Sequence, residues 1–508
     1  MANSEQSRPT AVQMRKTSLD KDLSKLSSME TASRALSMQL LAPGLAIIFL
    51  ACAGLLAATL SGENPNSALI VAAAIVGGYM ALNIGANDVA NNVGPAVGSK
   101  AMSLMAALVI AAVFESAGAI MAGGEVVSTI SKGIVDPKLV GDASTFVWAM
   151  MAALMSCAMW VNLATWLGAP VSTTHAVVGG VMGAGIAAAG IGVVNWGVMS
   201  AIAASWVISP VMGGGIAALF LWFIKSNIIY QEDKIAAARK WVPLLVSLML
   251  AAFSCYLVTK GLKKVWQPEA SVVALLGLAV FTISVLVLRP LIRAQSEGME
   301  NRNQSLRKLF HIPLIFSAML LSFAHGANDV ANAVGPLAAI LHTIQSGSVD
   351  ATVGIPLWIM MIGAFGISLG LFLYGPKLIK MVGEQITKMN PMRAFCVALS
   401  AAITVLIAST LGLPVSSTHI AVGGVFGVGF LREYYTTHSK RRRNYLANKA
   451  GKGKLVEIEA DERSEDEIVY RKLVRRSHFM TIVAAWIITV PASALLAGVL
   501  YFLLKQMG

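Results

Sequence analysis

The chain has 508 residues, of which 56% are hydrophobic and only 13% are charged. Ordinary soluble domains are about a quarter charged, and disordered chains have low hydrophobicity, so both classes are excluded. The formal charge of +13 would suit a nucleic-acid partner, but the basic residues lie in a few loops between apolar segments. That pattern is typical of membrane topology. We therefore expect a multi-pass protein of the lipid bilayer that binds no nucleic acid.

The chain begins with a polar stretch that lacks the layout of a signal peptide, and apolar segments follow. A membrane-spanning helix needs about 20 mostly apolar residues. Eleven segments meet this requirement: 40–60, 67–86, 101–121, 145–167, 197–224, 242–259, 271–289, 312–328, 353–375, 394–413 and 479–504. Two shorter Gly-rich runs, 175–190 and 419–431, could be spans, half-helices or re-entrant segments. The predicted fold class is an all-α polytopic membrane protein with about 12 transmembrane helices.

Two motifs each occur twice and in the same order. Residues 85–95 read GANDVANNVGP and residues 326–336 read GANDVANAVGP, which differ at one position. Residues 168–185 read GAPVSTTHAVVGGVMGAG and residues 412–429 read GLPVSSTHIAVGGVFGVG. The aspartate of the first motif precedes the first serine of the second by 84 residues in one copy and by 87 in the other. Gene duplication explains this matched spacing.

Loop charges predict how the two copies are oriented. Basic loops face the cytoplasm, and four loops are placed there: 225–240, 290–310, 376–393 and 432–477. The helix that enters the first GAND motif then runs inward and its counterpart runs outward, which is an inverted-topology repeat typical of secondary transporters. Three lysines, Lys260, Lys263 and Lys264, fall on the outside, against the charge rule.

This interpretation divides the chain into seven parts. They are a polar cytoplasmic tail (1–39), an extra N-terminal transmembrane helix (40–60), the first inverted repeat (67–224), central helices with basic loops (225–310), the second inverted repeat (312–431), a charged cytoplasmic loop (432–477) and a C-terminal transmembrane helix (478–508).

The GAND motifs place an aspartate within apolar surroundings in each half. A buried aspartate costs about 2.5–3.5 kcal/mol on insertion scales, so Asp88 and Asp329 need a partner. Neither motif contains Lys or Arg, and the glycines and prolines are expected to break the helices and free backbone carbonyls for a cation. We expect Na⁺ or H⁺, with Asn87, Asn91, Asn328 and Asn332 supplying further oxygens. The alternative is that these residues merely cap interrupted helices.

The second motif places hydroxyl groups where a Gly-rich helix begins. These residues are Ser172, Thr173, Thr174, Ser416, Ser417 and Thr418. A helix N-terminus offers free N–H groups and a positive dipole, so the pair of clusters suits a tetrahedral oxyanion. The alternative is an ordinary Ser/Thr cap. His175 and His419 close the motifs and fit either a structural or a proton-coupling role.

Two further polar residues lack a symmetric counterpart. Glu115 lies in an apolar span, where a carboxylate is a candidate functional residue. His325 precedes only the second GAND motif, where the first copy has Ile84, so it cannot be a symmetric requirement.

Together, the paired GANDVAN and PVSTTH/PVSSTH motifs resemble the inorganic phosphate transporter family. The resemblance covers roughly 67–224 and 312–431. It implies secondary uptake of inorganic phosphate with Na⁺ or H⁺, an inverted repeat with broken or re-entrant helices around one site at the bilayer midplane, and a homodimer. It implies phosphate binding at Asp88, Asn91, Ser172, Thr173, Thr174, Asp329, Asn332, Ser416, Ser417 and Thr418. It implies an ion site at Asn87, Asp88, Asn91, Asn328, Asp329 and Asn332, with Glu115 as a further candidate.

The coupling ion and the substrate each leave an alternative. The unaltered GAND motif resembles that of sodium-using members, whereas proton-using members carry a His-Asp pair there, so Na⁺ is favoured. The extra N-terminal span and Asn92, where the family often has Ala, depart from the family pattern. A sulfate or other oxyanion permease and an anion channel are the alternatives. We expect a transporter of the cytoplasmic membrane with no enzymatic activity and no cofactor beyond the co-transported ion.

Overall fold

A computed structural model describes residues 40–62, 64–167, 171–263, 266–347, 355–381, 389–438 and 476–506. The chain divides into two units, Met1–Phe49 and Leu50–Gly508. In the first unit the described residues 40–49 are helical, and the account below concerns the second. The predicted tail and most of the predicted charged loop lie outside the described residues.

Helices form nearly all of the described structure, apart from one isolated β-bridge between Val135 and Val194. The longer helices are α2 (Ser67–Asn87), α3 (Val89–Gly98), α4 (Leu104–Ala122), α6 (Ala143–Leu167), α7 (Thr173–Ala189), α8 (Trp196–Ile224), α9 (Lys234–Tyr256), α10 (Ala270–Gln295), α12 (His311–Ser346), α13 (Leu357–Met381), α14 (Pro391–Thr410), α15 (Ser417–His438) and α18 (Arg476–Lys505). Shorter turns are α5 (Gly124–Ser128), η2 (Thr129–Gly133), η3 (Pro137–Leu139), η4 (Ile191–Val193), η5 (Lys225–Ile229), η6 (Leu257–Gly261) and α11 (Asn303–Leu309).

Eleven helices of the described residues are long and apolar enough to cross a membrane, which confirms the predicted all-helical membrane fold. The helix Leu40–Ser61 is the first of them. α7 is a shorter apolar helix, with 17 residues. α15 continues to His438, seven residues past the predicted end of its apolar run.

Several helices begin where side chains replace the missing backbone partners. Ser103 accepts a hydrogen bond from the backbone N–H of Ala106, and Asp233 accepts one from Ala236. These caps satisfy N–H groups that a helix start leaves open. The C-terminal end of α12 is set by Gly347, whose φ is +63°. This left-handed conformation, which glycine tolerates, stops the helix.

The predicted break at the GAND motifs is wrong for the second copy. α12 runs without interruption from His311 to Ser346, through the motif and through Pro336. In the first copy the helix is interrupted at Asp88, not at the glycines or at Pro95, which lies inside α3. A proline within a membrane helix removes one backbone hydrogen bond, and neighbouring helices can compensate for it.

The two halves of the chain make matching helix pairs. α2 packs against α13, and α12 packs against α4. A Cβ on Gly85 would collide with the backbone carbonyl of Ile367, and one on Gly326 would collide with that of Glu115. Each GAND glycine therefore permits a close approach of two helix backbones, in place of the predicted helix break.

A second matching set involves the C-terminal helix. α7 packs against α18, and α15 packs against α8. Gly183 meets the backbone of Ala494 in the first contact, and Gly427 meets that of Gly214 in the second. α18, predicted to lie outside the repeat, thus contacts α7 through small residues in the way that α8 contacts α15.

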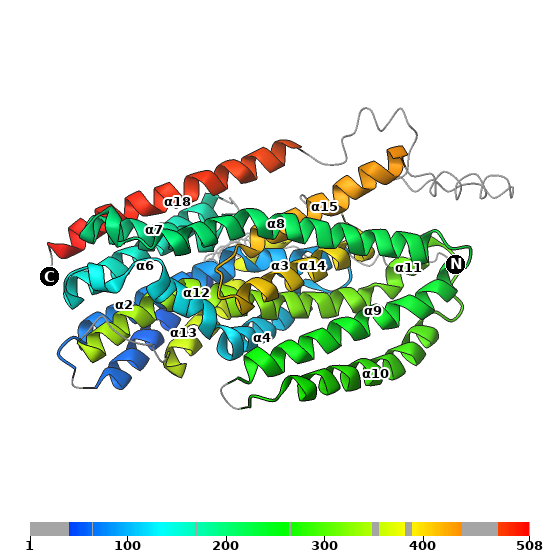
Figure 1. Cartoon of the computed structure of the whole chain (residues 1–508), viewed down its shortest axis with the longest axis horizontal. Helices are drawn as coiled ribbons and strands as arrows, with labels where there is room; N and C mark the ends of the chain where they lie inside the picture. Colours follow the sequence, from blue (N-terminus) through cyan, green and yellow to red (C-terminus); the bar gives the residue numbers. More distant parts are fainter. Residues whose placement is uncertain are drawn as a thin grey trace, which may run out of the picture. The chain divides into compact units, whose positions relative to one another are not determined.

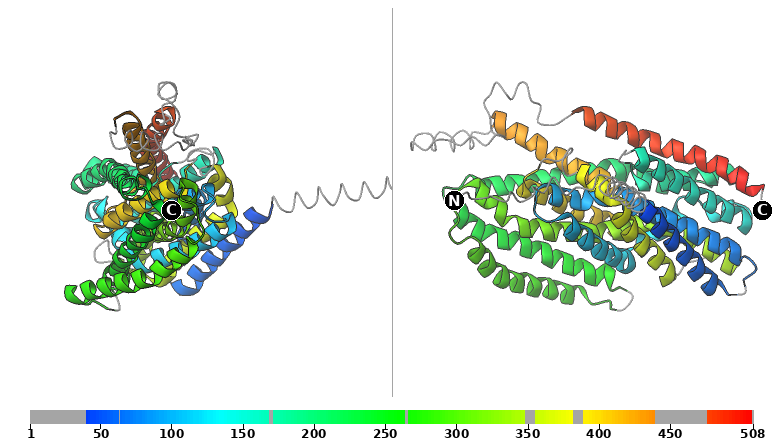
Figure 2. Two further views of the ribbon diagram at one scale, coloured as in Figure 1. Left: turned by 90° about the vertical axis from the view of Figure 1, so that its right-hand side faces the viewer. Right: turned by 180° about the vertical axis from the view of Figure 1, so that it is seen from behind.

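The central helices α9 and α10 lie side by side as an antiparallel hairpin (Figures 1 and 2). The turn at its tip carries the lysines that broke the charge rule. Lys263 Nζ lies 2.9 Å from Glu125 Oε1, and Lys260 Nζ lies 3.7 Å from the same oxygen. These lysines thus have an acidic partner in α5, while Lys264 lies outside the described residues.

Candidate phosphate and ion site

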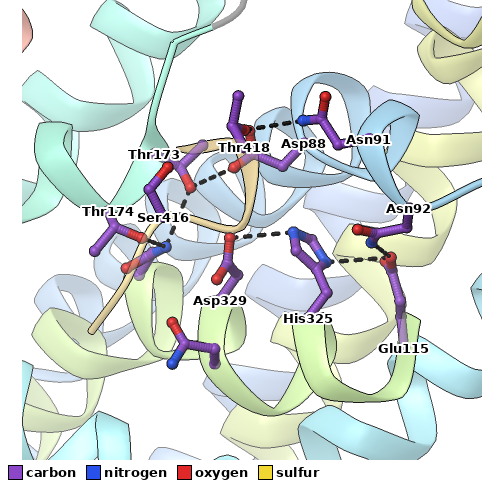
Figure 3. Close-up of polar contacts among 12 residues, drawn as sticks. Asp88, Asn91, Asn92, Glu115, Thr173, Thr174, His325, Asp329, Ser416 and Thr418 are labelled. Atoms are coloured by element: carbon purple, nitrogen blue, oxygen red, sulfur yellow. Dashed lines mark hydrogen bonds and ion pairs between the residues drawn. The ribbon is translucent and has the colours of Figure 1, made fainter. Parts of the chain in front are cut away.

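Both copies of both motifs meet in one buried site (Figure 3). Asp88 lies at the junction of α2 and α3, and Asp329 lies in the middle of α12. The hydroxyl clusters stand at the N-termini of α7 and α15, and one threonine of each cluster contacts Asp88. Of the predicted site residues, all are buried except Asn91, which is half-buried.

Asp88 accepts hydrogen bonds from both halves of the chain. Thr173 donates to its Oδ2 at 2.6 Å, and Thr418 donates to its Oδ1 at 3.2 Å. The amide of Asn91 donates to Thr418 Oγ1 at 2.9 Å. Hydroxyl hydrogen bonds to a carboxylate are among the stronger ones in proteins, so this half of the site is held rigidly.

Asn332 makes the corresponding contacts from the second half. Its amide donates to Thr173 Oγ1 at 3.1 Å and to Thr174 Oγ1 at 3.2 Å. Thr174 in turn donates to the carbonyl of Val415 at 3.0 Å. Each asparagine therefore reaches the hydroxyl cluster of the opposite half, and the site cannot form from one half alone.

Asp329 has a different neighbour. His325 Nε2 lies 3.1 Å from Asp329 Oδ2, and the other ring nitrogen lies 3.1 Å from Glu115 Oε1. The amide of Asn92 donates to the same Glu115 oxygen at 2.8 Å. Sequence analysis named Glu115 but neither His325 nor Asn92 as a site residue. The available signal was that none of these three polar residues has a polar counterpart in the other copy.

Several buried oxygen atoms of the site have no hydrogen-bond partner. They are Asp329 Oδ1, Asn332 Oδ1 and Ser417 Oγ. Ligand atoms of Asp88, His325 and Asp329 also lie within 4.8 Å of one another. Carboxylate, amide and hydroxyl oxygens are the ligands that small hard cations prefer, so the site can take a cation.

Four predicted site residues form hydrogen bonds that stabilise helix starts or connect helices. Ser172 and Ser416 accept hydrogen bonds from the backbone N–H groups of His175 and His419, which are cap contacts. The amide of Asn87 donates to Thr165, so it ties α2 to α6. Asn328 donates to Ser409 and to the carbonyl of Leu413, and accepts from Val415 N–H.

The two motif histidines pack against each other in a tilted arrangement, with 38° between their ring planes. The ring centroids of His175 and His419 are 4.4 Å apart, and Trp206 lies 3.7 Å from His175. Trp206 also donates to the carbonyl of Pro414 at 3.3 Å. These three rings join α7, α8 and α15 near the starts of α7 and α15.

The segment that leads into the second hydroxyl cluster is supported from outside the site. Lys260 Nζ donates to the carbonyl of Thr410 at 3.3 Å, and Thr129 Oγ1 donates to that of Gly412 at 2.7 Å. The hydrogen bond from Lys263 holds the pKa of Glu125 below its ordinary value. Glu125 therefore stays ionised and keeps both lysines beside this segment.

Several known proteins are similar to this chain over most of its length. A model described as the phosphate transporter family matches residues 84–497. A protein of Helicobacter pylori named "Putative phosphate permease" is 48% identical, over 94% of this chain and 98% of that protein. One of Pyrococcus abyssi with the same description is 33% identical, over 85% of this chain and 97% of that protein.

A solved structure entitled "The sodium-dependent phosphate transporter" superposes with a TM-score of 0.76 at 35% identity. It covers 87% of this chain and 100% of the solved chain. Family and fold together indicate a permease rather than an enzyme. The chain belongs to the phosphate transporter family.

Proposed function

We propose that the chain is a symporter that imports inorganic phosphate together with Na⁺ across the cytoplasmic membrane. One observation carries the proposal: two aspartates and two hydroxyl clusters meet in a buried site that retains oxygens without partners. The name of the similar solved structure supports both the substrate and the ion.

The charges of the two cargoes explain why they would travel together. Phosphate is an anion near neutral pH, and an isolated anion is costly in a site of low dielectric. Na⁺ at Asp329 and Asn332 would neutralise that charge. The phosphate would then bind to the threonine hydroxyls and to the N–H groups at the starts of α7 and α15.

The matching helix pairs support an inverted repeat that works by alternating access. α2 with α13 corresponds to α12 with α4, and α7 with α18 corresponds to α15 with α8. We assign α18 to the second repeat for this reason, so that the charged loop interrupts the repeat between α15 and α18. Rocking one repeat against the other would expose the shared site to either side.

Reconstitution in liposomes tests the proposal. Uptake of labelled phosphate is measured with an inward Na⁺ gradient, with a pH gradient, and with neither, each with and without excess sulfate. We expect uphill uptake that follows the Na⁺ gradient and resists sulfate. Only downhill flux would identify a channel, and equal displacement by sulfate would identify a general oxyanion permease.

The aspartates are tested in the same vesicles. Asp88→Asn and Asp329→Asn should each lower coupled uptake by about a hundredfold, the upper end of losses seen when groups around a bound ion are changed. Full Na⁺-driven uptake in either variant would contradict the assignment of the ion site.

A proton as the coupling ion is the second candidate. The contact of His325 with Asp329 favours it, because this histidine-aspartate pair lies at a GAND motif. The pH-gradient arm of the vesicle experiment separates the two ions. A homodimer, as the family resemblance implies, is the proposed assembly, and cross-linking in vesicles measures it.

A further inference from the structure

A groove lies between α9 on one side and α8, α12 and α14 on the other. It has a volume of about 450 Å³. Leu245, Leu248 and Ala252 of α9 line one wall, and Leu320, Leu399 and Ile403 line the other. The lining is apolar apart from Tyr256 and Thr410, which lie at the C-terminal ends of α9 and α14.

Hydrocarbon, not water, is the medium that fits this groove. All four bordering helices are candidate membrane spans, so the groove lies at the depth of lipid chains. Apolar cavities stay dry in proteins, because water would lose its hydrogen bonds there. Leu248 is 58% exposed and Ile407 is 44% exposed, so the groove is accessible from the side of the helix bundle.

The polar end of the groove carries a net positive charge. Lys260 donates to the carbonyl of Thr410, which lines the groove, and Lys263 lies one helical turn away. Glu125 is the acidic partner of both lysines, so the three groups together retain one positive charge. A phosphodiester placed there would meet two ammonium groups at the end of an acyl-chain groove.

We propose that this groove binds an acyl chain of an anionic glycerophospholipid, with the lipid phosphate at Lys260 and Lys263. The bound lipid would fill the space between the α9–α10 hairpin and the rest of the unit. It would also contact Thr410 and Leu411, the start of the segment that leads to the second hydroxyl cluster. The proposal does not depend on the transported substrate.

Photolabelling of the full chain in vesicles tests the site. The probe is phosphatidylglycerol with a diazirine at the end of one acyl chain, and adducts are mapped by mass spectrometry. We expect adducts on the groove residues of α9 and α14. Ala252→Trp places a bulky ring in the groove and should lower these adducts at least fivefold. Ala274→Trp on the exposed face of α10 is the matched control and should leave them unchanged.

A competition experiment on the unmodified chain tests whether the site prefers an anionic lipid head group. It does not rely on the Ala252→Trp variant. One basic residue near the membrane surface contributes about a fivefold preference for an anionic lipid. Unlabelled phosphatidylglycerol should therefore displace the probe about fivefold better than phosphatidylcholine, and Lys260→Gln with Lys263→Gln should abolish the preference.

Three results would overturn the proposal. The first is equal labelling of the groove and of the outer face of α10, which would mean a bulk lipid annulus. The second is no difference between the two competing lipids. The third is cross-linking of cysteines introduced into the groove to a second copy of the chain, which would make the groove a dimer interface.

Discussion

The two GAND motifs are nearly identical in sequence, yet their aspartates have different surroundings. Asp88 is bound by two hydroxyl groups, from Thr173 and Thr418. Asp329 contacts a histidine and keeps one oxygen without a hydrogen-bond partner. The first carboxylate is therefore already held by the protein, and the second has capacity left for a cargo ion.

The one differing motif position and residues outside the motifs cause this difference. The backbone contacts of Gly326 with Glu115 and of Gly85 with Ile367 identify Ile367 as the counterpart of Glu115. The motif register pairs His325 with Ile84, and Asn92 with Ala333. Glu115, Asn92 and His325 thus form a buried polar chain that joins the two halves, whereas their three counterparts are apolar. A duplicated motif can keep its sequence while its environment diverges.

The largest effect is expected from breaking this polar chain. Glu115→Ile alone would remove the carboxylate that His325 contacts and that accepts a hydrogen bond from Asn92, and it should lower stability by about 3–5 kcal/mol. Adding His325→Ile reproduces the Ile84–Ile367 arrangement and should recover at least about 1 kcal/mol. Thermal unfolding in detergent of both single variants and the double variant measures this coupling. Additive losses would show that the two residues do not interact.

The close helix approach that both halves share should be almost as sensitive. Gly326→Ala would force a Cβ against the Glu115 backbone, which cannot rotate away, and should cost about 3 kcal/mol. Gly215→Ala, in open space on α8, is the control and should change stability by less than about 1 kcal/mol. Unfolding temperatures that fall equally in both variants would contradict the packing.

Removing a single hydroxyl group from each half should change stability by a smaller amount, and by different amounts in the two halves. Thr173→Val removes a hydrogen bond to Asp88 and should lower stability by about 1.5–3 kcal/mol. Ser417→Ala removes a hydroxyl without a partner, so stability should change by less than about 0.5 kcal/mol. In vesicles, however, Ser417→Ala should raise the Na⁺ or phosphate concentration for half-maximal uptake. An unchanged requirement for both cargoes would remove Ser417 from the site.

The smallest effect is expected at the exposed pair of Glu125 and Lys263. Such pairs contribute at most about 1 kcal/mol. Because the pKa of Glu125 is lowered from 4.5, its contribution is complete above that pH and is lost as the pH falls through the lowered pKa. The difference in unfolding temperature between the parent and Glu125→Gln should therefore vanish in strong acid. A difference that persists there would assign the effect to packing.

The membrane class, the eleven spans and most of the residues that meet in the candidate site could be predicted from the sequence, but His325 and Asn92 could not. The predicted features follow from local rules, because hydropathy sets the spans and the repeated motifs mark the polar exceptions. Sequence analysis predicted a break in the second GAND helix that does not occur. The glycines that suggested it allow backbone contact with another helix, and a motif by itself does not tell these uses apart.

The sequence by itself determined that two aspartates would lie within the membrane, since no loop around them could carry the charge to water. Only the tertiary structure decided their partners. Thr418 is far from Asp88 along the chain, and Glu115 is far from His325. Local pattern has no information about such pairs, because they form only when helices from opposite halves pack together. The lysines at the tip of the α9–α10 hairpin likewise acquired their acidic partner through packing.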